Sequence, residues 1–172
     1  MTESRLQNLA AWLYGATLAC QIALPIILGL VFVALSMGVT FAPMPQGADP
    51  SGSLLWLGIA VGLVPAAALF WALDILRCLF ARYREGDVLT QGSADLIGRA
   101  GKAFLLIAVL NILVHPLQTL LLTWQSPPGS RTISVSIGQA EIGFVLLAGL
   151  LTVIGLAMTE AARIADENKS FV

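Results

Sequence analysis

The fold is decided by residues 77–102, RCLFARYREGDVLTQGSADLIGRAGK, which separate two long apolar halves of the chain. We call this stretch the hinge segment; it carries five of the nine Lys and Arg residues and three of the ten Asp and Glu residues. With 58% hydrophobic and only 11% charged residues, the chain is far more apolar than a soluble domain, in which about a quarter of residues are charged. The sequence therefore predicts an integral membrane protein whose spans are arranged around this charged interruption.

Four apolar stretches are long enough to cross a bilayer, which takes about 20 helical residues. They predict a single-domain, all-α membrane protein whose four transmembrane helices form two hairpins. The predicted spans cover residues 9–39, 54–82, 101–124 and 141–159, and a cytoplasmic helical tail follows over 160–172.

The hinge segment should end one helix and begin the next. Gly86 and Asp87 favour a helix end, and Thr90 is a suitable N-cap for the following helix. Residues 91–102 then predict a short interfacial helix that bends into the third span.

On the other side of the membrane, the two loops are rich in Pro and Gly. Apolar and polar residues alternate over 133–137, which is the period of a strand with one apolar face. This strand could pair with residues 39–41 in a small external β-ribbon.

Small residues at four-residue spacing let helices approach closely. Two such stripes predict that the first and second spans pack tightly against each other. The stripes are Ala11, Gly15, Ala19 and Ala23 in the first span, and Gly58, Gly62 and Ala66 in the second.

The cations divide unequally between the two sides of a four-span topology. Eight of the nine lie on the side of the termini and the hinge segment, and Arg131 alone lies on the other. By the positive-inside rule, both termini and the hinge segment are predicted to be cytoplasmic.

The hinge segment and the tail resemble a known family. The run RYREGDVLTQGSADLIGRAG at 82–101, followed by an apolar span, is similar to the bacterial membrane family catalogued as domain of unknown function 2975, and so is the ending MTEAARIADENKSFV at 158–172. The resemblance implies a four-helix protein of the bacterial inner membrane with no assigned activity, often working beside a small helix-turn-helix regulator. It supplies no catalytic residues.

The third span carries a polar stripe. Its members share one helical face and are Asn111, His115, Gln118 and Thr119. Gln21 of the first span is also expected to point inward. Polar groups at membrane depth are costly and often functional, so the stripe supports a transport hypothesis. We favour a neutral His115 that is hydrogen-bonded across helices, because a proton relay needs further titratable groups and the sequence reveals none at that depth.

Catalysis and metal binding lack the residues they need. A single histidine and two widely spaced cysteines do not make a metal site, which takes three or four convergent ligands. The sequence therefore predicts neither an enzyme nor a bound cofactor.

Two functional hypotheses stay open. The first is a regulatory or sensory protein that binds a cytoplasmic protein partner, and not nucleic acid, through its hinge segment and tail. The second is a small transporter or channel-like module lined by the polar stripe, which a homo-oligomer could also form. Candidate contacts to a partner or to membrane lipid are Arg82, Arg84, Arg99, Lys102, Arg163 and Phe171.

Overall fold

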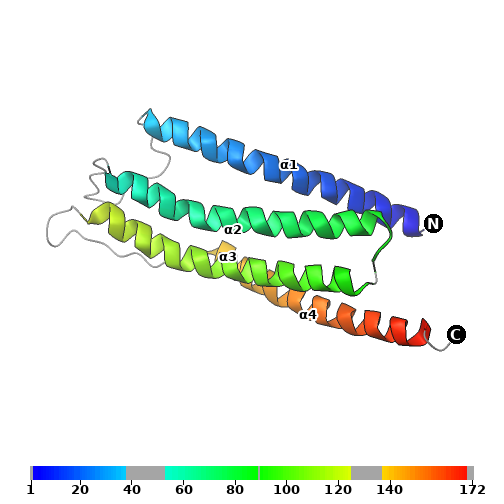
Figure 1. The fold of residues 1–172 in the computed structure, drawn as a ribbon. Coiled ribbons are helices and arrows are strands. Elements are labelled where there is room, and N and C mark those ends of the chain that lie inside the picture. The colour runs from blue at the N-terminus through cyan, green and yellow to red at the C-terminus, as the bar shows by residue number, and fades with distance from the viewer. Residues whose placement is uncertain (1, 38–52, 89, 125–136, 170–172) are drawn as a thin grey trace.

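A computed structural model describes residues 2–37, 53–88, 90–124 and 137–169. These residues form four helices: α1 (Thr2–Ser36), α2 (Ser53–Arg84), α3 (Gln91–Thr123) and α4 (Gln139–Lys169). All four are long and apolar enough to cross a membrane, which confirms the predicted all-α class. Successive helices run antiparallel, so the start of α1 and the end of α4 lie at the same end of the molecule (Figure 1).

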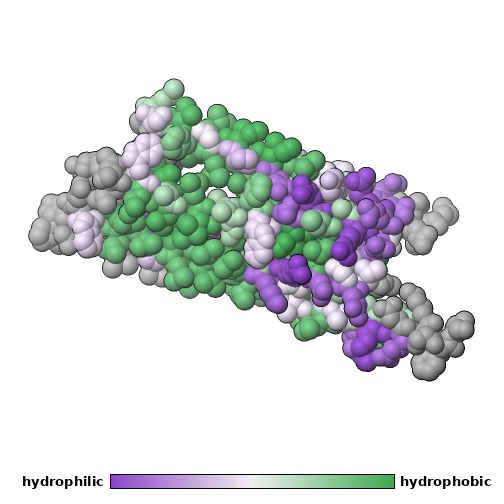
Figure 2. Space-filling view, viewed as in Figure 1, coloured by the Kyte–Doolittle hydropathy of each residue, from purple (hydrophilic) through white to green (hydrophobic). Residues whose placement is uncertain are grey.

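Polar residues gather at that same end. On the face drawn in Figure 2, hydrophilic residues cover the region where α1 begins and α4 ends, and hydrophobic residues cover most of the rest. We call this the charged end, and the other the opposite end. Large apolar side chains such as Leu30, Leu113 and Leu146 are exposed along the helices. An apolar surface of this extent is typical of a protein that contacts lipid.

The four helices form an open row. Helix α2 packs against α1 and α3, and over the described residues the backbone of α4 packs only along α3. The predicted division into two hairpins is therefore not confirmed, because α2 packs along α3 as well as along α1. The core joins α2, α3 and α4 and consists mainly of small side chains: Ala68, Ala72, Ile75, Ala100, Ala103, Phe104, Ile107 and Ala148.

The turn between α2 and α3 follows the local sequence. Gly86 adopts φ +90°, a conformation that glycine tolerates best, just after α2 ends. Thr90 caps α3, because its Oγ1 accepts a hydrogen bond from the Ser93 backbone N–H at 3.3 Å. The predicted helix end and N-cap are therefore confirmed. Residues 91–102 are the first turns of a continuous α3, and no interfacial helix is set apart from the span.

The small-residue stripe of α1 does not face α2, so the predicted packing through that stripe is wrong. Nothing lies within 4 Å of the Cβ position of Gly15, and Ala11 and Ala19 are exposed. The buried face instead includes Thr17 and Gln21. Polar side chains gain from leaving lipid, which favours turning them toward a neighbouring helix.

Helix α4 is displaced along α3 toward the charged end. Gly155 packs against Gly98, and Gly101 packs against Ala148. With this register the first turn of α4 lies beside Asn111, roughly twelve residues, or about 18 Å, before the end of α3. Figure 1 shows α4 beginning near the middle of α3 and continuing past its start.

The remaining predictions concern segment ends. The predicted tail is the last part of α4, which continues as a helix to Lys169. No strand occurs in the described ranges, and Ile137 lies outside any helix or strand. The other residues of the proposed β-ribbon, 39–41 and 133–136, fall outside the described residues, as does Phe171.

Candidate functional site

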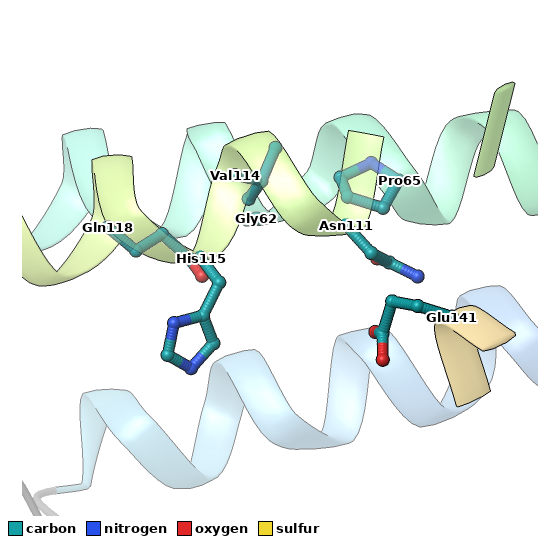
Figure 3. A pocket seen from close by; sticks show the side chains of 7 residues that line it. All are labelled: Gly62, Pro65, Asn111, Val114, His115, Gln118 and Glu141. Carbon is teal, nitrogen blue, oxygen red and sulfur yellow. The ribbon is translucent and has the colours of Figure 1, made fainter. Parts of the chain in front are cut away.

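The polar stripe of the third span meets α2 and α4 at a pocket of about 270 Å³. Three of the four predicted stripe residues line it. Figure 3 shows the lining residues: Gly62, Pro65, Asn111, Val114, His115, Gln118 and Glu141. Thr119 does not line the pocket; its hydroxyl donates a hydrogen bond to the Pro116 carbonyl at 2.9 Å. We call this space the polar pocket.

Gln118 links α3 to α2. Its side-chain Nε2 donates a hydrogen bond to the carbonyl oxygen of Gly58 at 3.1 Å. Its amide also fills the space where a side chain at Gly62 would lie. The glycines of the α2 stripe therefore face α3, and the prediction that the stripe packs against α1 is wrong. The Gln118 amide occupies the space beside Gly62 and hydrogen-bonds to the carbonyl of Gly58.

Glu141 is the residue that sequence reasoning missed. Its carboxylate accepts a hydrogen bond from the Gly138 backbone N–H at 2.7 Å, so it caps the start of α4. Because Glu141 is the first residue of the predicted fourth span, the sequence predicts that it lies at the membrane edge. The displacement of α4 instead places it beside Asn111 and His115. The sequence around Glu141 does not predict that it lies near Asn111 and His115, because this proximity depends on how α4 is aligned along α3.

The polar pocket lies well inside the apolar length of α3. Asn111 is about 18 Å from Thr123 and about 14 Å from Lys102, counted along the helix. Figure 3 shows the His115 ring and the Glu141 carboxylate projecting from two helices on the same side of α3. An amide, an imidazole and a carboxylate around one opening can together accept and donate hydrogen bonds to a polar or cationic solute.

Gln21 is not among the residues that line the polar pocket. It lies in α1, where its side chain is only 9% exposed, so the prediction that it points inward is confirmed. Its Oε1 has no hydrogen-bond partner among the described residues.

At the charged end, the side chains of four cations lie against neighbouring residues. Arg77 pairs with Asp74 at 2.8 Å, three residues away on the same helical face. The Arg84 guanidinium lies 5.1 Å from the centre of the Tyr14 ring, a cation–π contact between α2 and α1. The Arg82 guanidinium lies over Gly92 of α3.

Arg163 is the fourth of these cations. It pairs with Glu160 at 2.6 Å and with Glu167 at 2.8 Å, all on the surface of α4.

Arg99 and Lys102 differ from these four cations. Both side chains are exposed, and no carboxylate of the described residues forms an ion pair with either of them. They line a groove of about 300 Å³ between α3 and α4. We call it the cationic groove; its other lining residues include Asp95, Thr152, Leu156 and Thr159.

The described residues contain no group of three or more His, Cys, Asp or Glu side chains that could hold a metal ion. Four apolar helices in one row, with charges concentrated at one end, define the class of the protein: a multi-pass membrane protein. Comparison with protein-family models, with curated proteins and with solved structures found no match.

Proposed function

We propose that the chain is a regulatory or sensory protein of the bacterial inner membrane, and that its charged end faces the cytoplasm and binds a soluble protein. The distribution of cations supports this orientation, since eight of nine belong to the termini and the hinge segment. The resemblance of the hinge segment and the tail to the bacterial family named above supports a helix-turn-helix regulator as the partner.

One observation carries the proposal: α4 continues as a helix beyond the start of α3 (Figure 1). This part of α4 is stiffened by Arg163, which holds one carboxylate a turn before it and another a turn after it. Ile164 lies beside Arg163 and is 48% exposed. An apolar side chain within a charged, rigid surface is a suitable anchor for a protein partner.

The test is photo-crosslinking in membranes. A photoreactive residue at Ile164 should crosslink to one soluble protein, and the same residue at Leu6, near the start of α1, serves as the control at the same end. Deletion after Ala165 should reduce capture of that protein, whereas Arg5→Gln should not. If the tail deletion and substitutions in the hinge segment leave capture unchanged, the proposal is wrong.

A second candidate function is transport of a small cation or proton through the polar pocket. The observation that favours it is the position of Glu141, which supplies an acid at the depth of Asn111 and His115. Ionisable groups at this depth are costly in lipid and commonly mark a solute path.

The two candidates respond differently to mutation. In proteoliposomes that carry a pH-sensitive dye, Glu141→Gln and His115→Leu should abolish ion-driven flux if the pocket conducts. Deletion after Ala165 should leave that flux intact. Absence of proton flux in the unmodified chain under sodium, potassium and proton gradients would exclude proton transport and proton-coupled transport of sodium or potassium.

A further inference from the structure

We infer that the cationic groove between α3 and α4 binds the headgroup of an anionic phospholipid, with Arg99 and Lys102 holding its phosphate. The two cations are three residues apart on one face of α3, and both line the same groove. Basic pockets between membrane helices on the cytoplasmic side are typical headgroup sites. The inference concerns lipid and is independent of the protein partner proposed above.

The distribution of contacts singles out these two residues among the cations of the hinge segment. Arg77 is neutralised by a carboxylate, Arg84 rests on an aromatic ring, and Arg82 lies over Gly92. Arg99 and Lys102 have no such contact with the described residues. Long cationic side chains with free ends can reach from the helix to the headgroup region while their stems stay on apolar surface.

The shape of the groove follows from two glycines. An added Cβ at Gly155 would come within 3.0 Å of the backbone nitrogen of Gly98, so the helices touch there. The close approach leaves a shallow space on the side where Arg99 and Lys102 project. On the α4 wall, the Thr152 and Thr159 hydroxyls donate to their own helix, at 2.8 and 2.9 Å. None of the α4 residues that line the groove is charged, so the positive charge of the groove comes from α3.

The displacement of α4 makes the groove amphipathic. The α4 residues that line the groove are uncharged, and the one large apolar residue among them, Leu156, is 69% exposed. Val153, one turn before Leu156 on α4, is 66% exposed. A bound lipid could place its phosphate between the two cations and its acyl chains along this surface. A free phosphate ion would use the cations alone and leave the apolar surface unused.

Asp95 is the one acid that lines the groove. Two cations and one acid still leave the groove net positive. A carboxylate there can accept hydrogen bonds from headgroup hydroxyls, which favours a glycerol-type anionic lipid over a simple phosphate. Phosphatidylglycerol is therefore the appropriate probe.

The experiment is a lipid titration of the purified full-length chain in mild detergent, read by native mass spectrometry. Phosphatidylglycerol should bind more tightly than phosphatidylcholine. Each of Arg99→Gln and Lys102→Gln should weaken phosphatidylglycerol binding by about fivefold. The double variant R99Q/K102Q should remove the preference. Both side chains are exposed, so the single variants can carry the test if the double variant does not fold.

The control removes the same charge elsewhere at the charged end, by Arg5→Gln together with Arg163→Gln, and should leave the preference intact. An equal loss in this control would show general charge attraction and overturn the inference. Binding that millimolar inorganic phosphate displaces completely, or that persists unchanged in R99Q/K102Q, would overturn it too. Crosslinking of a soluble acidic protein to Lys102, with no lipid preference, would assign the groove to a protein instead.

Discussion

Gly155 of α4 packs directly against the backbone of Gly98 in α3. This contact sets the register of the two helices, and both candidate sites depend on that register. One turn farther from the charged end, Gly101 packs against Ala148 in the same way. Contacts between small residues of this kind allow membrane helices to approach at the backbone.

Gly155→Val should destabilise the protein. The added side chain would meet the backbone of Gly98, which cannot move aside as a flexible side chain can. We expect a loss of about 1–3 kcal/mol, seen as a lower midpoint of thermal unfolding in detergent. Gly149→Val is the matched control, because nothing lies within 4 Å of the Cβ position of Gly149 on the same helix. Equal shifts in the two variants would contradict the observed register.

Gln118→Met should weaken the contact between α2 and α3 while conserving most of the side-chain volume. The variant loses the hydrogen bond to the Gly58 carbonyl. Hydrogen bonds between membrane helices contribute about 0.6 kcal/mol on average, so a small fall in unfolding free energy is expected. Leu117→Met, at an exposed neighbouring position, should change it less. A larger effect at Leu117 than at Gln118 would argue against this role of the hydrogen bond.

The polar pocket should be accessible to water although it lies inside the apolar length of α3. After the two exposed native cysteines are replaced by alanine, Glu141→Cys should react with a membrane-impermeant thiol reagent added from the opposite end. Leu146→Cys, which replaces an exposed apolar residue of the same helix, should not react because lipid surrounds it. Labelling at neither position, or at both, would mean that the pocket is not a distinct aqueous opening.

The orientation can be tested in intact cells with the same cysteine-free chain. Glu85→Cys, in the exposed turn between α2 and α3, should be labelled only after the membrane is permeabilised. Ser51→Cys, two positions before α2 in the sequence, should be labelled without permeabilisation. The reverse pattern would place the charged end outside the cytoplasm and would exclude the proposed cytoplasmic partner.

Much of the local structure could be predicted from the sequence because it depends on contacts within a few residues. Helix length and apolarity predict the four helices, since backbone groups in lipid must be hydrogen-bonded within a helix. The Thr90 cap and the ion pairs of Arg77 and Arg163 follow from three-residue and four-residue spacing. The continuation of α4 to Lys169 follows from the absence of Pro or Gly after Gly155.

Only the tertiary structure shows which helical faces contact each other and in what register along their axes. In lipid, sliding one apolar helix along another changes little apolar burial, so hydrophobic pattern does not select a register. Backbone contacts between Gly98 and Gly155 select it instead, and they place Glu141 beside Asn111. The same register places Arg99 and Lys102 in one groove with Leu156 and two uncharged threonines of α4. For the same reason, the small face of α1 could be recognised in the sequence, while its exposure could not.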